Sequence, residues 1–115
     1  MTVSAAVTAD LADLTRLFAG YLRFYRVPRD EAEIAAFLGL RLQRGDSQLF
    51  IARSEQGAAQ GFVQLYPFHS SLALEPAWLL SDLYVDESAR RSGVGEALMK
   101  AARALSLIHI SERAG

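Results

Sequence analysis

The 115-residue sequence contains no cysteine, only three prolines and a single tryptophan. The absence of cysteine excludes disulfides, thiolate metal sites and a cysteine nucleophile. No apolar run approaches the roughly 20 residues that a membrane-spanning helix needs, and no signal-peptide pattern opens the chain. We therefore expect a cytoplasmic protein without a membrane partner.

Neither charge is in excess, because 12 lysines and arginines stand against 13 aspartates and glutamates, for a formal net charge of −1. This balance gives no broad basic surface for nucleic acid, so any anion site must be local. The two histidines form no cluster with carboxylates in the sequence. We expect no nucleic-acid partner and no metal.

The chain does have the composition of one packed domain, with 51% hydrophobic and 22% charged residues. Its apolar residues recur with the period of strands in some segments and with that of helices in others. Strands are predicted at 2–6, 48–53, 61–66 and 77–85, and helices at 11–25, 30–44 and 94–105. The order β-α-α-β-β-β-α predicts an α+β (mixed α/β) fold.

Turn signals surround the predicted central strand, residues 77–85. Pro67 is expected to end the regular pairing of the preceding strand, and Glu75-Pro76 to form a turn. Regular alternation in the central strand places two sets of four residues on opposite faces: Trp78, Leu80, Asp82 and Tyr84 on one, and Leu79, Ser81, Leu83 and Val85 on the other. Both sets are mainly apolar, which is typical of a strand covered on both sides.

The most informative stretch follows this strand, where a polar turn leads into the last predicted helix. Glycines at 93 and 95 let the backbone approach a ligand closely, and the start of the helix offers N–H groups to an anion. A Walker loop needs Lys-Ser/Thr where the chain has Glu96-Ala97, and a Rossmann fingerprint needs a small residue where it has Leu98. The remaining prediction is an anion-binding turn of another kind.

The pattern Arg90-x-x-Gly93-x-Gly95, between Leu83-Tyr84-Val85 and Ala97-Leu98-Met99, resembles the pyrophosphate loop of the GNAT superfamily of acyl-CoA-dependent N-acyltransferases. The resemblance implies a GNAT-like fold, with a mostly antiparallel central sheet flanked by helices. It implies acetyl-CoA as co-substrate and a primary amine of a small molecule or protein as acceptor. The cofactor-binding residues that it implies are Leu83, Tyr84, Val85, Arg90, Arg91, Ser92, Gly93, Val94, Gly95 and Glu96.

The resemblance also implies individual roles along this stretch. A backbone N–H near Leu83 would polarise the thioester oxygen, and the edge of residues 83–85 would pair with the pantetheine arm. Arg90 and Arg91 would add positive charge, unless they are ordinary solvated surface residues.

A general base should lie on or near the central strand, where the available carboxylates are Asp82 and Glu75. Asp82 is our candidate catalytic residue beside Leu83, with fixation of the local structure by hydrogen bonding as the alternative role. Ser81 stands where some relatives carry a glutamate. His69 is expected at the surface.

Aromatic residues on the first predicted helix allow two interpretations. Tyr21, Phe24 and Tyr25 have helical spacing, which favours packing in the core. In the family, however, the first two helices often border the acyl-acceptor site, so these side chains are also candidates to line it.

The end of the chain carries an unusual match. Leu105–Glu112 equals, residue for residue, the translation of a transposase adapter end used in DNA sequencing libraries. We therefore interpret 105–115 as a non-native tail, and 1–104 as an N-acetyltransferase domain without the family's C-terminal strands and helix. The missing strand would leave one edge of the central strand unpaired. The alternative is a genuine strand from Leu105 to Ile110.

Three functions follow from these observations. The first is an N-acetyltransferase in which the amine attacks acetyl-CoA directly in a ternary complex. The alternatives are a non-catalytic acyl-CoA-binding module and an inactive fragment of an acetyltransferase. Many relatives dimerise, so a homodimer is a further expectation, without a predicted interface.

Overall fold

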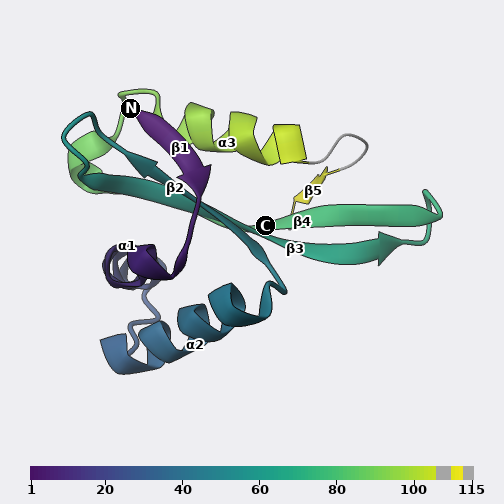
Figure 1. The fold of residues 1–115 in the computed structure, drawn as a ribbon, viewed down its shortest axis with the longest axis horizontal. Coiled ribbons are helices and arrows are strands. Elements are labelled where there is room, and N and C mark those ends of the chain that lie inside the picture. The colour runs from purple at the N-terminus through teal and green to yellow at the C-terminus, as the bar shows by residue number, and fades with distance from the viewer. Residues whose placement is uncertain (106–109, 113–115) are drawn as a thin grey trace.

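The computed structural model describes residues 1–105 and 110–112. One five-stranded sheet, in the order β1-β2-β3-β4-β5, separates helices α1 and α2 from helix α3 (Figure 1). The strands are β1 (Thr2–Ala5), β2 (Gln48–Arg53), β3 (Ala59–Ser70), β4 (Glu75–Val85) and β5 (Ile110–Glu112). The helices are α1 (Leu11–Phe24), α2 (Glu31–Arg44), α3 (Val94–Leu105) and the short 3-10 turns η1 (Thr8–Asp10) and η2 (Glu87–Ala89).

This architecture confirms the predicted α+β class, the predicted order of elements and the antiparallel pairing of the first four strands. The helix ends follow their sequence signals. Asp30 caps α2 by accepting a hydrogen bond from the N–H of Ala32, and Gly45 ends the helix in the left-handed conformation, with φ 63°.

Two apolar layers hold the sheet between the helices. On one face, α1 and α2 pack against β2 and β3; the buried residues of this layer include Leu14, Leu17, Phe18, Ile34, Leu38, Leu49, Ile51 and Phe62. On the other face, α3 covers the sheet; the buried residues there are Ala52, Val63, Leu65, Ala89, Val94, Leu98 and Ala102. The apolar side of α3, with Val94, Leu98 and Ala102, is therefore the side that docks on the sheet.

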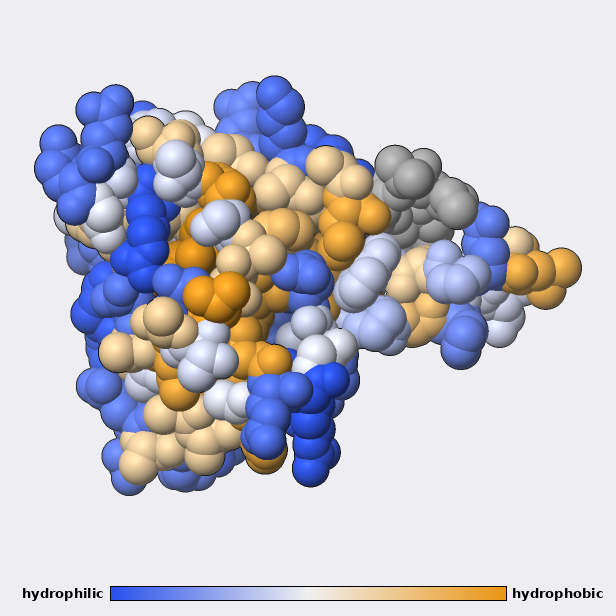
Figure 2. Space-filling model, viewed as in Figure 1, coloured by the Kyte–Doolittle hydropathy of each residue, from blue (hydrophilic) through white to orange (hydrophobic). Residues whose placement is uncertain are grey.

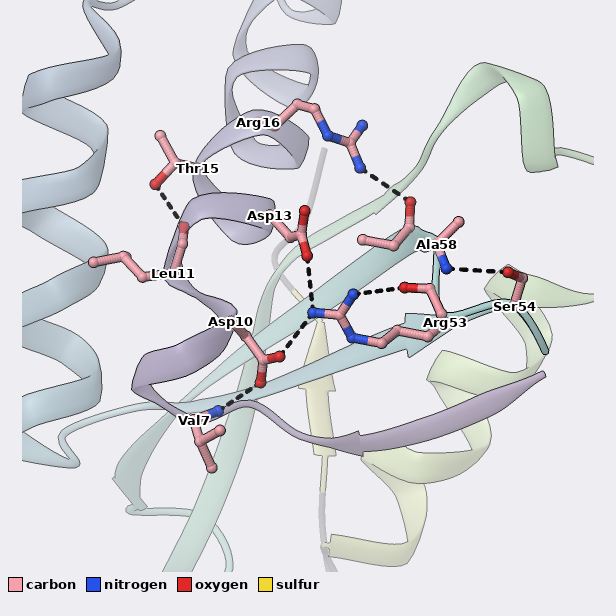
Figure 3. A network of polar contacts seen from close by, with 11 residues as sticks. Val7, Asp10, Leu11, Asp13, Thr15, Arg16, Arg53, Ser54 and Ala58 are labelled. Atoms are coloured by element: carbon pink, nitrogen blue, oxygen red, sulfur yellow. Dashed lines mark hydrogen bonds and ion pairs between the residues drawn. The ribbon is translucent and has the colours of Figure 1, made fainter.

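Arg53 at the end of β2 connects the sheet to the start of α1 (Figure 3). Its guanidinium Nη2 lies 2.8 Å from Asp10 Oδ1 and 3.0 Å from Asp13 Oδ2, and its Nη1 donates to the carbonyl of Gly57. Burial alone raises the pKa of Asp10, but hydrogen bonds from the Val7 N–H and from Arg53 outweigh it, so the net shift is downward. One arginine thus fixes two carboxylates and a hairpin turn.

The hairpin of β3 and β4 runs beyond the helices as a two-stranded arm (Figure 1). Pro67 lies within β3 opposite Trp78, and Pro76 lies within β4, so the expected end of pairing at Pro67 and the expected turn at Glu75-Pro76 are wrong. Because β2 begins at Gln48, opposite Leu65, the part of β3 beyond Leu65 has an open edge, where proline is tolerated. The arm ends in apolar atoms (Figure 2), and its exposed leucines are Leu72 and Leu74.

A β-bulge interrupts β4 at Ser81. Gln64 of β3 pairs with Asp82, but the next residue, Leu65, pairs with Leu80, so that Ser81 is an extra residue in the strand. The extra residue reverses the alternation of side chains. Leu80 packs on the α3 face, whereas Asp82 hydrogen-bonds to α1. The predicted common face of Leu80 and Asp82 is therefore wrong.

The edge of β4 is paired in part. Strand β5 runs parallel to β4, with Trp78 opposite Ile110 and Leu80 opposite Glu112. The expectation that this edge is unpaired is thus wrong for residues 78–80. The predicted tail, 105–115, lies partly outside the described residues, at 106–109 and 113–115; the described strand occupies 110–112, not 105–110.

Candidate functional site

The loop between β4 and α3 has an unusual backbone. Arg91 and Gly93 both lie in the left-handed region, with φ 68° and 83°. The hydroxyl of Ser92 donates to the carbonyl of Ala89 and so braces the turn. The first helical hydrogen bond runs from the N–H of Ala97 to the carbonyl of Gly93, at 3.0 Å. The N–H groups of Val94, Gly95 and Glu96 therefore precede the helical ladder, where an anion can accept from them.

The two glycines of the loop serve different needs. Gly93 supplies a positive φ that costs other residues roughly 1–2 kcal/mol. Gly95 has an ordinary conformation, and a β-carbon there would lie 3.6 Å from Val85 Cγ2, an ordinary contact distance. Its lack of a side chain leaves the start of the helix open to a ligand.

The two arginines behave differently. The Nε of Arg90 donates to the carbonyl of Val85 at 3.0 Å, and its guanidinium lies 5.6 Å from the Tyr84 ring and 5.7 Å from the Phe24 ring. Although Arg90 is exposed, these contacts fix its charge at the end of β4. Arg91 is exposed and contributes chiefly its backbone conformation to the turn.

A cavity of about 310 Å³ lies between α1 and the end of β4. Its lining residues are Tyr21, Phe24, Tyr25, Leu83, Tyr84, Val85 and Arg90. Phe24 and Tyr25 are 63% and 60% exposed, so packing in the core does not account for them. Three aromatic residues at the C-terminal end of α1 and directly after it thus meet the predicted cofactor strand at one cavity.

The cavity adjoins the part of β4 that extends past β5. The described pairing of β4 with β5 covers residues 78–80, while Leu83, Tyr84 and Val85 line the cavity. On this side, residues 83–85 have no strand partner among residues 1–105 and 110–112. Their backbone groups at this edge are available to an extended ligand.

Asp82 lies next to this edge and on the α1 side of the sheet. Its Oδ1 accepts a hydrogen bond from the hydroxyl of Tyr21 at 2.8 Å, and its Oδ2 accepts one from Gln64 Nε2 at 3.0 Å. Gln64 is fully buried, and its Oε1 accepts a hydrogen bond from the hydroxyl of Ser47 at 2.8 Å. Both oxygens of the candidate carboxylate are therefore held by side chains.

Gln64 and Ser47 were not among the residues predicted from the sequence. A signal for Gln64 exists, since it is the polar residue inside the apolar run from Phe62 to Leu65. A buried side-chain amide in such a run needs hydrogen-bond partners for both its oxygen and its nitrogen, which indicates a polar network. Ser47 offers no comparable signal, because it lies in the turn before β2.

The other candidates are not among the residues that line the cavity. Glu75 begins β4 opposite Ser70, in the arm, and His69 is exposed in the same arm, as expected. Ser81 is the bulge residue of β4.

Over the described ranges, no three histidine or carboxylate side chains lie close enough together to hold a metal ion. None of the described helices is long and apolar enough to cross a membrane.

Comparison with known proteins gives one consistent family. Residues 45–114 match the acetyltransferase (GNAT) domain family. The chain is 40% identical over 103 residues to the uncharacterized N-acetyltransferase YhfO of Bacillus subtilis strain 168, covering 90% of this chain and 68% of that protein. It is 34% identical over 99 residues to a probable acetyltransferase of Haemophilus influenzae, covering 86% of this chain and 66% of that protein.

A solved structure agrees with these relatives. The crystal structure of a probable acetyltransferase superposes with a TM-score of 0.93 at 32% identity, covering all of this chain and 80% of that one. The agreement extends to the whole described fold, including the sheet and both helical layers.

Proposed function

The chain belongs to the GNAT family of acetyltransferases, and on this premise we propose that it transfers an acetyl group from acetyl-CoA to a primary amine of a small molecule or protein. The observation that carries the proposal is the loop from Arg90 to Gly95, where two left-handed residues lead directly into a helix whose first N–H groups precede the helical ladder.

The loop suits a pyrophosphate. Backbone N–H groups from Arg91 to Glu96 and the positive end of the helix dipole would stabilise its negative charge. Arg90 adds a full charge, held by the carbonyl of Val85. Gly95 leaves room for phosphate oxygens beside the first helical turn.

The end of β4 suits the rest of the co-substrate. Pantetheine carries amides that would pair with the edge of residues 83–85 as an added strand would. The N–H of Leu83 would then donate to the thioester oxygen as negative charge develops on it.

The remaining reactant is the amine. In direct transfer, the amine nitrogen attacks the thioester carbonyl carbon, a C–N bond forms and the C–S bond breaks. The proton lost by nitrogen ends on sulfur, giving the N-acetyl product and CoA. We assign the acceptor amine to the cavity of about 310 Å³, because its lining includes both Leu83 and the exposed aromatic residues Phe24 and Tyr25. Asp82 is the carboxylate nearest to Leu83 in the strand.

Calorimetric titration of acetyl-CoA into the 115-residue chain tests the cofactor site. Gly93→Val should abolish one-to-one binding, because valine is strained at φ 83° and distorts the loop. Gly45→Val is the matched control, since Gly45 also has a positive φ, 63°, but ends α2 with open space around it. Equal affinity of wild type and Gly93→Val, or equal loss in both variants, would contradict the loop assignment.

Turnover separates an enzyme from a binding module. Wild type is incubated with acetyl-CoA and a panel of amines, and release of free CoA is followed by a thiol reagent. Acetylation of at least one amine is expected. A chain that binds acetyl-CoA, melts cooperatively and acetylates none would instead be a non-catalytic acyl-CoA-binding module.

A further inference from the structure

Four polar side chains from separate parts of the chain form one line of hydrogen bonds. They come from the turn before β2 (Ser47), from β3 (Gln64), from β4 (Asp82) and from α1 (Tyr21). The hydrogen bonds measure 2.8, 3.0 and 2.8 Å in that order. Gln64 is fully buried, so the line runs through the interior and reaches the cavity at Tyr21.

Each hydrogen bond in this line has a fixed direction. Ser47 donates to the amide oxygen of Gln64, which leaves the amide nitrogen of Gln64 to face Asp82. An ionised carboxylate only accepts, so the hydroxyl of Tyr21 must donate its proton to Asp82. The oxygen of Tyr21 has no second proton, and toward any ligand it can act only as a hydrogen-bond acceptor.

Neighbouring rings hold Tyr21 in place. Its ring lies edge-on to Phe62, with centroids 5.7 Å apart, and edge-on to Tyr84, at 6.2 Å. Phe62 is fully buried and Phe18 nearly so, and Phe18 also contacts Tyr21 at 5.3 Å. The phenol oxygen therefore has a fixed position, and the direction of its hydrogen bond to Asp82 is fixed as well.

We propose that Tyr21 is the residue that receives the acceptor, by accepting an N–H hydrogen bond from the incoming amine, and that Asp82 acts through Tyr21 as a positioning residue. This inference rests on the proposed acetyl transfer. Tyr21 and Leu83 line the same cavity, so the amine would be held beside the strand edge assigned to the thioester. The substrate class is an amine with at least one N–H, and its cationic form gains from the charge of Asp82 behind Tyr21.

The inference assigns a different role to Asp82 from that of a general base. A base must take a proton from the amine at one of its oxygens. Each oxygen of Asp82 already accepts a hydrogen bond, one from Tyr21 and one from Gln64, and the cavity is lined by Tyr21 but not by Asp82. Asp82 therefore orients the phenol and does not touch the amine.

Steady-state kinetics of the 115-residue chain with a primary amine test the role. Tyr21→Phe keeps the ring and removes the hydroxyl, so kcat/KM for the amine should fall about tenfold or more, while acetyl-CoA affinity measured by calorimetry stays unchanged. Thr15→Val is the control: it removes a hydroxyl on the same helix that bonds only to the carbonyl of Leu11 among the described contacts, and it should leave both values unchanged.

Two further readouts separate positioning from packing. Asp82→Asn should lower kcat/KM to a similar degree. The double variant should have a kcat/KM no lower than that of the more impaired single variant, because both substitutions disrupt the same Tyr21–Asp82 hydrogen bond. A trimethylammonium analogue of the amine has no N–H, and as a competitive inhibitor it should bind wild type and Tyr21→Phe alike. The pH profile of kcat/KM should keep its shape in Tyr21→Phe.

Specific outcomes would overturn the inference. One is an unchanged kcat/KM in Tyr21→Phe, and another is a double variant in which the two single losses multiply. A third is loss of the acidic limb of the pH profile in Asp82→Asn, because that result would identify Asp82 as a base. A wild-type chain that binds acetyl-CoA but acetylates no amine would instead contradict the proposed function, and the role of Tyr21 with it. Absence of acetyl-CoA binding in a wild-type chain that melts cooperatively would contradict the cofactor site and the proposed function that depends on it.

Discussion

Gly20 of α1 lies directly against the hydroxyl of Tyr84 in β4: a β-carbon at position 20 would stand 2.7 Å from that oxygen. The contact explains a glycine inside a helix, where alanine would ordinarily be more stable by about 0.5–1 kcal/mol. It also joins α1 to the strand end that we assign to the co-substrate. Tyr84 also lines the cavity of about 310 Å³, so this contact fixes one of its walls.

Gly20→Ala should therefore lower acetyl-CoA affinity while changing the stability of the fold little. The gain in helix propensity offsets part of the cost of displacing the Tyr84 ring, so the melting temperature should change by only a few degrees while acetyl-CoA affinity falls. Gly39→Ala in α2 is the control, because a β-carbon there would lie 3.7 Å from Leu11 Cδ2. Gly39→Ala should raise stability by about 0.5–1 kcal/mol and leave affinity unchanged. A Gly20→Ala variant with the same gain and full affinity would contradict this account.

Arg53→Met should destabilise the fold by about 1–3 kcal/mol in urea denaturation, because it leaves Asp10 and Asp13 without their shared cation. The side chains of Arg53 and Asp10 are 24% and 15% exposed, so solvent replaces the lost contact poorly. Arg29→Met is the comparison, since Arg29 lies just before α2 and pairs with Glu33 through side chains that are 59% and 61% exposed, so the loss should be at most about 0.5 kcal/mol. Equal losses of unfolding free energy in the two variants would show that the contacts of Arg53 with Asp10 and Asp13 in Figure 3 add no more stability than an exposed ion pair does.

Stability should also depend on pH through Asp10. The pKa of Asp10 is lower in the folded chain than its ordinary value of 3.8. Between these two pKa values the unfolded chain binds more protons, so the contribution of Asp10 is fully present above about pH 4 and is lost as pH falls through the folded pKa. Asp10→Asn should be less stable than wild type at pH 7, and the difference should shrink as pH falls from 4 to 2. Urea denaturation at several pH values measures this, and a difference that is constant with pH would exclude Asp10 as the cause.

Local patterns predicted most of the fold. The apolar residues of α3 recur with the helical period, and Asp30 and Gly45, residue types that commonly begin and end helices, cap α2 in the structure. The loop of Gly93 and Gly95 was also predictable, because its residue types are required by its backbone. Such features depend on residues that are close together in the chain, so they can be recognised from the sequence alone.

Features that depend on distant partners were not predictable. The bulge at Ser81 arises from the register between β3 and β4, and a regular strand and a bulged strand have the same local sequence. The network around Asp82 joins positions 21, 47, 64 and 82, whose proximity exists only in the folded chain. The prolines of the arm were misread because only the sheet shows that β3 has an open edge beyond Leu65.

The bulge residue Ser81 can be removed without changing the face of any other side chain of β4. Deletion of Ser81 removes the extra residue and leaves Leu80 opposite Leu65 and Asp82 opposite Gln64, so each side chain keeps its face. Deletion of Leu79 also shortens β4 by one residue, but it would bring Ser81 opposite Leu65 and turn Leu80 toward α1. Ser81 would then replace an apolar residue in the layer under α3, at a cost of about 2–3 kcal/mol relative to deletion of Ser81.

Thermal melting of the two deletion variants tests this difference. We expect the Ser81 deletion to melt cooperatively near the wild-type temperature, and the Leu79 deletion to melt well below it. Acetyl-CoA titration into the Ser81 deletion then shows whether the bend of the bulge is needed to present residues 83–85 at the strand edge. If the two deletions were equally unstable, the faces of Leu80 and Asp82 would not be set by the bulge, and the position of the Tyr21–Asp82 pair would need another cause.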